Sequence, residues 1–527
     1  MGTVAAVGSV RSSAVALVVA LTLAPAALRA QCPDGSPQPC GRAAPARSVA
    51  VLDFVNESRD STDAYLADGV TDEITSRLGQ LERLVVTSRT GMRRLPHAAT
   101  LAPPALGRAL GVTYLVSGTV RRGVGRVRIA VELLRASSGV TVWSSQYDRP
   151  DGDLLSIEQD LATAVAAAIA GRLLPGERAS LAARPTASGT AYDHFLRGNW
   201  YLAQRTGPAA QRAIAEYQLA TAQDPGFVQA RARTAYAYAL TLDWGWPHPG
   251  VPDDSLVARG LREADQVLAQ DSQLSDGWMA RGHLLGHRDP RNLAGALEAF
   301  RRAIALDTGN AEAYHQYAWT LLITGRDSAA LAMYRRALAV DPARAITLDE
   351  MSLVYLVHHQ LPETLVWQDS ALAVDSAAFW VLNDRAHTKL LLGDLTGARA
   401  DAEAARRLGP PGFTYWGEAV LTILAAREGD TAEARSRADR LARGIEESGR
   451  PTVQEARWIG AALAAAGERS EALDLLESVP QERRGALLWF FLRFPELDAL
   501  RSDPRFRRLM NDARPEGAPE ILSGGPG

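Results

Sequence analysis

Lysine is almost absent from this chain of 527 residues, in which Lys389 stands against 56 arginines. A P-loop needs a lysine after its glycines, and a protein kinase needs a strand lysine beside the nucleotide phosphates. Lys389 lies in the helical pattern KLLLGDL and suits neither role. The motifs His-Glu-x-x-His and Gly-x-Ser-x-Gly are also missing. We therefore predict no catalytic residues, no cofactor and no enzymatic activity.

Cysteine is equally scarce, since Cys32 and Cys40 are the two in the chain. Two thiols cannot complete a structural zinc site, which needs four ligands. Both lie in a turn-rich linker over residues 31–47. In an oxidising compartment they could form a disulfide, and two unpaired thiols are the alternative.

Long hydrophobic runs are missing too. The apolar run Ala14–Leu23 is followed by Pro25 and by the small residue Ala30, a pattern typical of an export signal over residues 1–30. The run is shorter than the roughly 20 residues that span a bilayer. We predict a periplasmic or secreted protein of the cell envelope. The alternative is an uncleaved anchor, which would place the chain at a membrane.

The overall charge of the chain does not favour binding of nucleic acid. The formal net charge is −3, so no basic footprint for nucleic acid is present. Hydrophobic residues make up 47% and charged residues 22% of the chain, as in globular proteins. At this length two or more domains are expected.

What the sequence does contain is a repeat. Asp307, Asp341 and Asp375 follow one another at intervals of 34 residues (341 − 307 = 375 − 341 = 34) and close successive helical patterns. Small residues and an aromatic recur at fixed offsets, as in Ala330, Tyr334 and Ala337. This pattern resembles the tetratricopeptide (TPR) consensus. It predicts an all-α solenoid of about eight units over residues 191–484, which implies a protein or peptide partner on the concave side.

Candidate partner-binding residues follow from that register. An insertion over Asp243–Asp254 carries Trp244 and Trp246, which could reach a partner or fold back on a neighbouring helix pair. First-helix positions outside the expected core would line the concave side, with ordinary solvated positions as the alternative. They are Gln316, Trp319, Asp349, Ser352, Asn383 and His387.

Two histidines could share a metal ion. His283 and His287 are four residues apart and share one helical face. No glutamate stands between them, and the helix is expected to end near Asp289-Pro290. The sequence therefore predicts no metal site.

Residues 48–174 differ from the repeats. Strand patterns at residues 48–54, 84–88, 114–121, 126–135 and 142–147 alternate with or follow helical patterns at 65–78, 104–110 and 154–174. Gly123-Val124-Gly125 predicts a hairpin. The arrangement favours a small α/β domain with a mixed sheet, ahead of the solenoid.

This region resembles a known domain. The segments VAVLDFVN, YLADGVTDEITSRL, LGVTYLVSGTVRR and RVRIAVELLRASSGVTVWSSQYDR are similar to the TolB amino-terminal-like (FlgO-type) domain. The resemblance implies protein interaction in the bacterial envelope and brings no catalytic residues. Asp53 stands where the family usually has proline.

Two polar groups in this domain allow other interpretations. Asp68, Asp72 and Glu73 would cap a helix start, although a metal site or a hydrolase centre is conceivable. Arginines flank the hairpin and are expected on a solvated face, with binding of a phosphate or an acidic partner as the alternative. They are Arg121, Arg122, Arg126 and Arg128.

The carboxyl-terminal sequence completes the interpretation. WFFLRF and the residues after it predict a closing helix over residues 485–512 that covers the last repeat, followed by a disordered tail over 513–527. The whole pattern indicates an exported adaptor that binds protein or peptide. The alternative is a membrane-anchored regulatory subunit for a separate kinase or cyclase.

Overall fold

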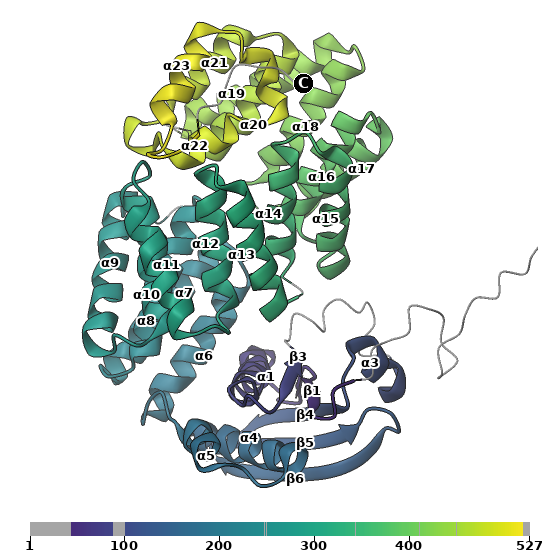
Figure 1. Ribbon diagram of the computed structural model, residues 1–527, viewed down its shortest axis with the longest axis vertical. Coiled ribbons are helices and arrows are strands. Elements are labelled where there is room, and N and C mark those ends of the chain that lie inside the picture. The colour runs from purple at the N-terminus through teal and green to yellow at the C-terminus, as the bar shows by residue number, and fades with distance from the viewer. Residues whose placement is uncertain are drawn as a thin grey trace, which may run out of the picture. The chain divides into compact units, whose positions relative to one another are not determined.

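In a computed structural model, residues 44–87 and 101–519 are described, apart from 247, 249, 343, 411 and 449–450. The expected export signal, Cys32, Cys40 and the end of the expected tail lie outside these residues. Within the described part of the chain, no helix is both long and apolar enough to cross a bilayer. The predicted fold class is confirmed, with a mixed sheet and its helices followed by paired helices (Figure 1).

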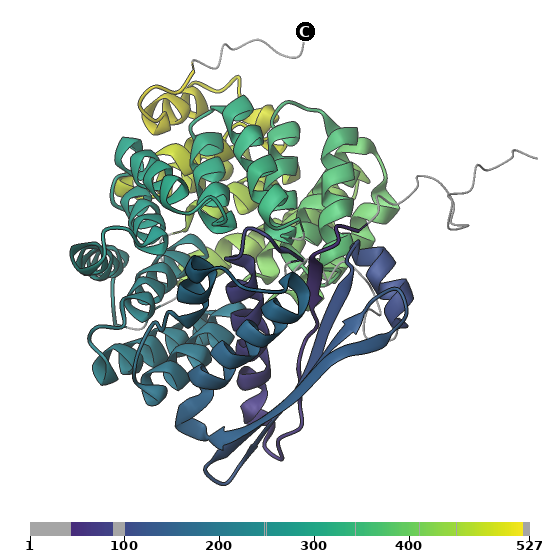
Figure 2. The same ribbon diagram turned by 60° about the horizontal axis from the view of Figure 1, so that its bottom comes forward.

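The sheet has the strand order β3-β1-β4-β5-β6, and the short β2 also pairs with β4. β1, β2 and β3 are in parallel pairings, whereas β4, β5 and β6 form antiparallel hairpins, which Figure 2 shows lying side by side. The expected turn at Gly123–Gly125 joins β4 to β5. The strands are β1 (Ser48–Val51), β2 (Val55–Asn56), β3 (Val85–Thr87), β4 (Tyr114–Gly123), β5 (Arg126–Arg135) and β6 (Val140–Pro150).

Successive side chains of β1 point to opposite faces of the sheet, and helices cover both faces. Val49 and Val51 are buried in a cluster with residues of α1 (Ala64–Gly79) and α4 (Leu154–Ala170). Ala50 points the other way and packs with Leu106 of α3 (Pro103–Leu110). Burial on both faces explains why SVAV is a continuous apolar run.

The polar groups of this domain are engaged within it. α1 begins at Ala64, so the expectation that Asp68, Asp72 and Glu73 cap a helix start was wrong, since all three lie inside the helix. Glu73 pairs with Arg77 at 2.6 Å.

Three of the four hairpin arginines are paired as well. Arg126 and Arg128 both bind Asp148. Arg122 lies 2.9 Å from Asp193 on the next domain's first helix, and it donates to the Tyr65 hydroxyl. Arg122 therefore joins the sheet to the helical array.

Gly118 of β4 provides a test of the sheet packing. A Cβ at this position would overlap the Phe54 ring and the Ala130 carbonyl oxygen. We expect Gly118→Ala to destabilise the domain by about 1–3 kcal/mol, the usual cost of overpacking, measured by thermal unfolding of the full chain. Gly123 ends the same strand with no described atom within 4 Å of such a Cβ, so Gly123→Ala is the control. Equal effects of the two changes would contradict this account.

Eight helix pairs follow among the described residues, after the short α5 (Pro175–Ala182). The pairs are α6 (Gly189–Ala203) with α7 (Gly207–Gln223), α8 (Val228–Asp243) with α9 (Asp253–Gln270), α10 (Ser275–Arg288) with α11 (Ala294–Leu306), α12 (Ala311–Ile323) with α13 (Asp327–Val340), α14 (Ala345–Leu356) with α15 (Leu361–Val374), α16 (Phe379–Leu392) with α17 (Leu395–Leu408), α18 (Thr414–Arg427) with α19 (Thr431–Ser448), and α20 (Val453–Ala466) with α21 (Arg469–Ser478).

The repeating aspartates end the second helix of each early pair. Asp307 and Asp375 have extended backbones directly after α11 and α15. Their carboxylates accept the backbone N–H two residues later, from Gly309 at 2.8 Å and from Ala377 at 3.0 Å. An aspartate that bonds its own backbone in this way favours a turn over a continued helix. The 34-residue spacing is therefore the spacing of helix stops.

The C-terminal segment (residues 485–519) closes the array. It contains α22 (Ala486–Phe491), η5 (Pro495–Leu500) and α23 (Pro504–Ala513). The N–H of Ala486 donates to the Pro290 carbonyl at 2.8 Å, and Arg493 pairs with Asp327 at 2.9 Å. The segment thus contacts the third and fourth helix pairs besides the last. Residues 514–519 also differ from the expected disordered tail, since the N–H of Glu516 donates to the Arg291 carbonyl.

Candidate functional site

The helical array encloses a cavity of about 520 Å³, a size typical of ligand sites. Its walls come largely from the first helices of successive pairs, from α8 to α20, together with α22. Aromatic side chains supply much of the surface because these helices turn their large residues inward. They are Trp244, Trp319, Trp380, Tyr415, Trp416, Trp458 and Phe491.

The inserted loop after α8 lies against the distant repeats. Trp244 and Trp246 stack with ring centroids 5.6 Å apart. Trp244 also makes edge contacts with Trp380 of α16 and with Phe413 before α18. The two indoles therefore fold back across the array, which is the second of the two roles considered for them. Trp244 remains part of the cavity wall.

A carboxylate cluster occupies the middle of the cavity wall. Asp349 and Glu350 are on α14 and Asp384 is on α16. Burial, with Asp384 and Glu350 adding repulsion, raises the pKa of Asp349 well above its usual range. Burial likewise raises the pKa of Asp384 to about 6. Asp349 is 3% exposed, and its Oδ1 has no hydrogen-bond partner among the described residues.

Arg457, a cation that acts on Asp349 and Asp384, is already engaged. Arg457 of α20 pairs with Glu496 of η5 at 2.9 Å, and both side chains are almost fully buried. The guanidinium also lies over the rings of Trp458 and Phe494, at 4.2 and 3.9 Å from their centroids. These contacts hold Arg457 in a geometry fixed by the C-terminal segment. The carboxylate cluster therefore has no free cation to balance it, and burial with mutual repulsion raises the pKa of Asp349 instead.

A second charged group lies on α12 and at the start of α14. Glu312 pairs with Arg344 at 2.5 Å. Burial would raise the pKa of Glu312, but Arg344 and His315 hold it well below its usual range. Burial lowers the pKa of His315 to about 3, so this imidazole is neutral at physiological pH. Its Nδ1 is 3.0 Å from the Thr347 hydroxyl.

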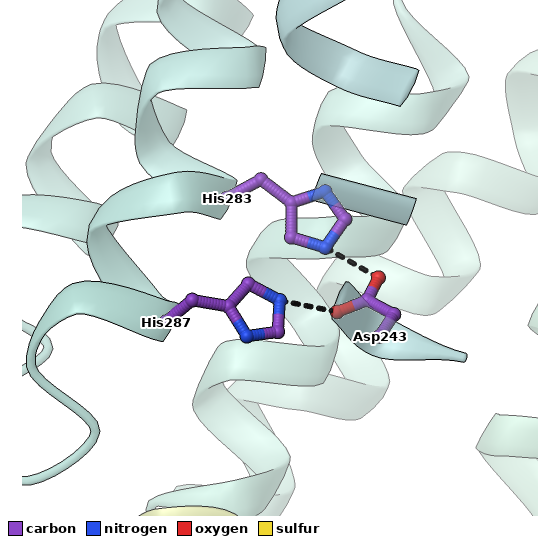
Figure 3. A group of neighbouring side chains, drawn as sticks. All are labelled: Asp243, His283 and His287. Carbon is purple, nitrogen blue, oxygen red and sulfur yellow. Dashed lines mark hydrogen bonds and ion pairs between the residues drawn. The ribbon is translucent and has the colours of Figure 1, made fainter. Parts of the chain in front are cut away.

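A third group joins α8 to α10. Asp243 ends α8, and His283 and His287 lie one turn apart on α10, so that both rings point at one carboxylate (Figure 3). The distances from Nε2 to the carboxylate oxygens are 2.5 Å for His283 and 2.7 Å for His287. Burial opposes ionisation of both partners, yet the attraction lowers the pKa of Asp243 and raises that of His283. All three residues line the cavity.

The predicted partner-binding residues are covered rather than open to solvent. Gln316, Trp319 and Asp349 line the cavity, as Trp244 does. Ser352, Asn383 and His387 are fully buried, and Trp246 is 5% exposed. The expected open concave face is not present there because the C-terminal segment lies over it, as in the contact between Phe490 and Trp319. A binding role for these residues stays a prediction.

Sequence reasoning missed Glu350, Asp384 and Arg457. One signal was available for Arg457, which is the single charge in the apolar stretch ARWIGAALAAA of α20. A lone charge in such a helix indicates a buried ion pair. No comparable signal marked Asp384, because charged residues are ordinary on the first helices of repeats.

Comparisons with known proteins extend to parts of the chain. No family model matches it. The protein named "Putative adenylate cyclase 3" from Rhizobium meliloti (strain 1021) is 28% identical over 236 residues. The match covers 45% of this chain and 39% of that protein, so the chain spans about two fifths of the length of this curated relative. The TolB-like identity of the α/β domain is not confirmed by these comparisons.

Solved TPR proteins are similar to the helical region. A thermophilic TPR protein from Thermus thermophilus is 18% identical, with a TM-score of 0.32, over 38% of this chain and 99% of that one. PilF from Pseudomonas aeruginosa is 17% identical, with a TM-score of 0.33, over 41% of this chain and 92% of that one. YrrB, described as a TPR protein with an unusual peptide-binding site, is 14% identical, with a TM-score of 0.26, over 38% and 94%. The helix pairs and their 34-residue spacing identify the region as a TPR array.

Proposed function

We propose that this chain is an exported, non-enzymatic binding protein of the bacterial envelope, and that its cavity receives a positively charged part of a protein or peptide. The observation that carries the proposal is the Oδ1 atom of Asp349 in the cavity wall, which has no hydrogen-bond partner among the described residues. A buried carboxylate without a partner costs free energy. The folded chain avoids this cost by retaining the Asp349 proton, and a bound ammonium or guanidinium group would stabilise the ionised form in its place.

The surroundings of Asp349 favour a cation over an anion. Glu350 and Asp384 lie close enough to repel its charge, and Arg457 is held by Glu496. Trp319 and Trp380 line the same cavity, and an indole ring attracts a cation placed over its face. An incoming carboxylate would meet three acidic side chains.

The remaining polar groups suit a peptide backbone. The indole N–H groups of Trp380 and Trp416 are buried without an acceptor among the described residues. Both indoles line the cavity, and each could donate to a carbonyl oxygen. A peptide with a free amino terminus, or with a lysine or arginine side chain, supplies both the cation and the carbonyl groups.

Defined peptides test this proposal. We expect short peptides with a free amino terminus or an internal lysine to bind the mature chain (residues 31–527), measured by calorimetry with chelator present. Acetylated peptides without a basic residue should bind weakly. Asp349→Asn should reduce binding by about tenfold or more, as expected when a charge-assisted hydrogen bond is lost.

The matched control is Asp369→Asn. Asp369 pairs with Arg385 and has a side chain that is 55% exposed outside the cavity, so binding should not change. Preference for anionic peptides, or equal binding by Asp349→Asn and the parent chain, would overturn the cationic assignment.

Export is a separate part of the proposal and rests on residues 1–30. A fusion of these residues to a reporter enzyme that is active solely in the periplasm should be active. An inactive fusion that is nevertheless expressed would contradict export.

The relative named a putative adenylate cyclase favours a second candidate, a membrane-anchored regulatory subunit for a separate cyclase or kinase. The amino terminus of the mature protein separates the two candidates. A start at Gln31 excludes the anchored subunit, and retention of residues 1–30 with membrane association supports it.

A further inference from the structure

We propose that Asp243, His283 and His287 form a site for a divalent transition-metal ion, suited to Zn²⁺, in the wall of the array cavity. Two histidines and one carboxylate are a ligand set that zinc uses when one coordination position stays open. The proposal does not depend on the proposed peptide binding, because metal binding is measured without a peptide.

The backbone places the three ligands for this purpose. His283 and His287 are separated by one turn of α10, so their rings lie on the same face and stack with centroids 5.8 Å apart. Asp243 comes from the end of α8, the first helix of the preceding pair. One potential ligand atom from each of the three lies within 4.8 Å of the others, and Figure 3 shows both rings directed at the carboxylate.

The distances are close to those of a metal centre. Zinc bonds of about 2.0–2.2 Å in a tetrahedron place ligand atoms roughly 3.4 Å apart. The two nitrogen–oxygen distances are 2.5 and 2.7 Å. Entry of the ion would require the carboxylate to withdraw by roughly 1 Å. Asp243 is the last residue of its helix, and its side chain is 28% exposed.

A second observation points to a ligand at His283. This side chain is 6% exposed, and neither of its ring nitrogens has a hydrogen-bond partner among the described residues. Nε2 is near Asp243 Oδ2, but the pair does not have hydrogen-bond geometry. A buried imidazole left in this state loses the hydrogen bonds it made with water. Coordination through Nε2 would replace this ion-pair contact with a directed bond to the metal.

The open position would face the cavity, since all three ligands line it. Glu312 and Arg205 line the same cavity and act on His283 with opposite charges. A simple pairing of two histidines with one aspartate is the competing explanation. Metal titration distinguishes the two.

The experiment is a titration of the chelator-treated full chain with Zn²⁺ alone, followed by calorimetry and by thermal unfolding. We expect one ion per chain and a rise in Tm with zinc. Co²⁺ in the same site should give visible absorption bands of a four- or five-coordinate ion. Failure of the parent chain to bind a stoichiometric ion would overturn the proposal.

Variants assign the ligands. Loss of an outer-shell partner alone typically costs about 10- to 100-fold in metal affinity, so His287→Gln and Asp243→Asn should each cost at least that much. The His287 side chain is 26% exposed, so His287→Gln should fold. His194 makes the same kind of contact with Glu216, at 2.6 Å, without a second histidine, and His194→Gln is the matched control. Zinc affinity unchanged in both ligand variants would assign the contact to ion pairing and overturn the site.

Discussion

Arg457→Ala is expected to reduce the free energy of opening of the C-terminal segment by about 3–5 kcal/mol, the usual cost of removing one partner from a buried ion pair. The Glu496 carboxylate would be left buried without its arginine. His387 lies 3.3 Å from it and could balance its charge if the imidazole were protonated. Burial lowers the pKa of His387, so this imidazole does not replace the lost cation at neutral pH. The ring contacts of the guanidinium are lost in the same change.

Hydrogen exchange over α22, η5 and α23 measures this effect, because repeat arrays open in stages and exchange reports local opening. Arg399→Ala is the control, since Arg399 pairs with Glu428 on the surface and should contribute less than about 1 kcal/mol. Adding Glu496→Gln to Arg457→Ala should restore part of the loss by removing the buried charge. If hydrogen exchange in Arg457→Ala is no faster than in the parent chain, the Arg457–Glu496 pair does not hold the C-terminal segment.

The individual repeats were predictable from the sequence because each is local. Asp307 and Asp375 stop helices through their own backbone bonds, and Ala330 and Tyr334 are buried where neighbouring helices meet. The hairpin at Gly123–Gly125 is local in the same sense. A period of 34 residues therefore specifies helix ends and the contacts between neighbouring helices.

Closure of the array was not predictable in this way. The contacts of Arg493 with Asp327 and of Trp244 with Phe413 join residues more than 160 positions apart. These contacts depend on the curvature of the array, which accumulates over several helix pairs. The register of a single repeat does not specify that total curvature. The same applies to the metal candidate, because the two histidines were visible in the sequence but Asp243 approaches them from another helix pair.

Asp349→Asn is expected to raise the stability of the folded chain at pH 7.5, by about 1–2 kcal/mol. Burial beside Asp384 and Glu350 raises the pKa of Asp349, so the folded state retains a proton that the unfolded state has released. Stability contributed by this group is therefore present below the ordinary carboxyl pKa of about 3.9 and is lost as the pH rises through the raised pKa. The asparagine variant lacks this titration, so its advantage should shrink towards pH 4. Thermal unfolding from pH 4 to pH 8 measures the difference.

The same substitution should weaken binding of cationic peptides, so stability and binding should change in opposite directions. If the Asp349 carboxylate served the fold alone, the Asp349→Asn variant would be less stable than the parent chain. Its preference for cationic peptides would be unchanged. Asp369→Asn, which removes an exposed carboxylate, should alter neither property by more than a few tenths of a kcal/mol. A loss of stability at pH 7.5 in Asp349→Asn would mean that Asp349 has a stabilising partner in the folded protein. That result would remove the physical reason for a cation in the cavity, because binding was inferred from the cost of leaving this carboxylate alone.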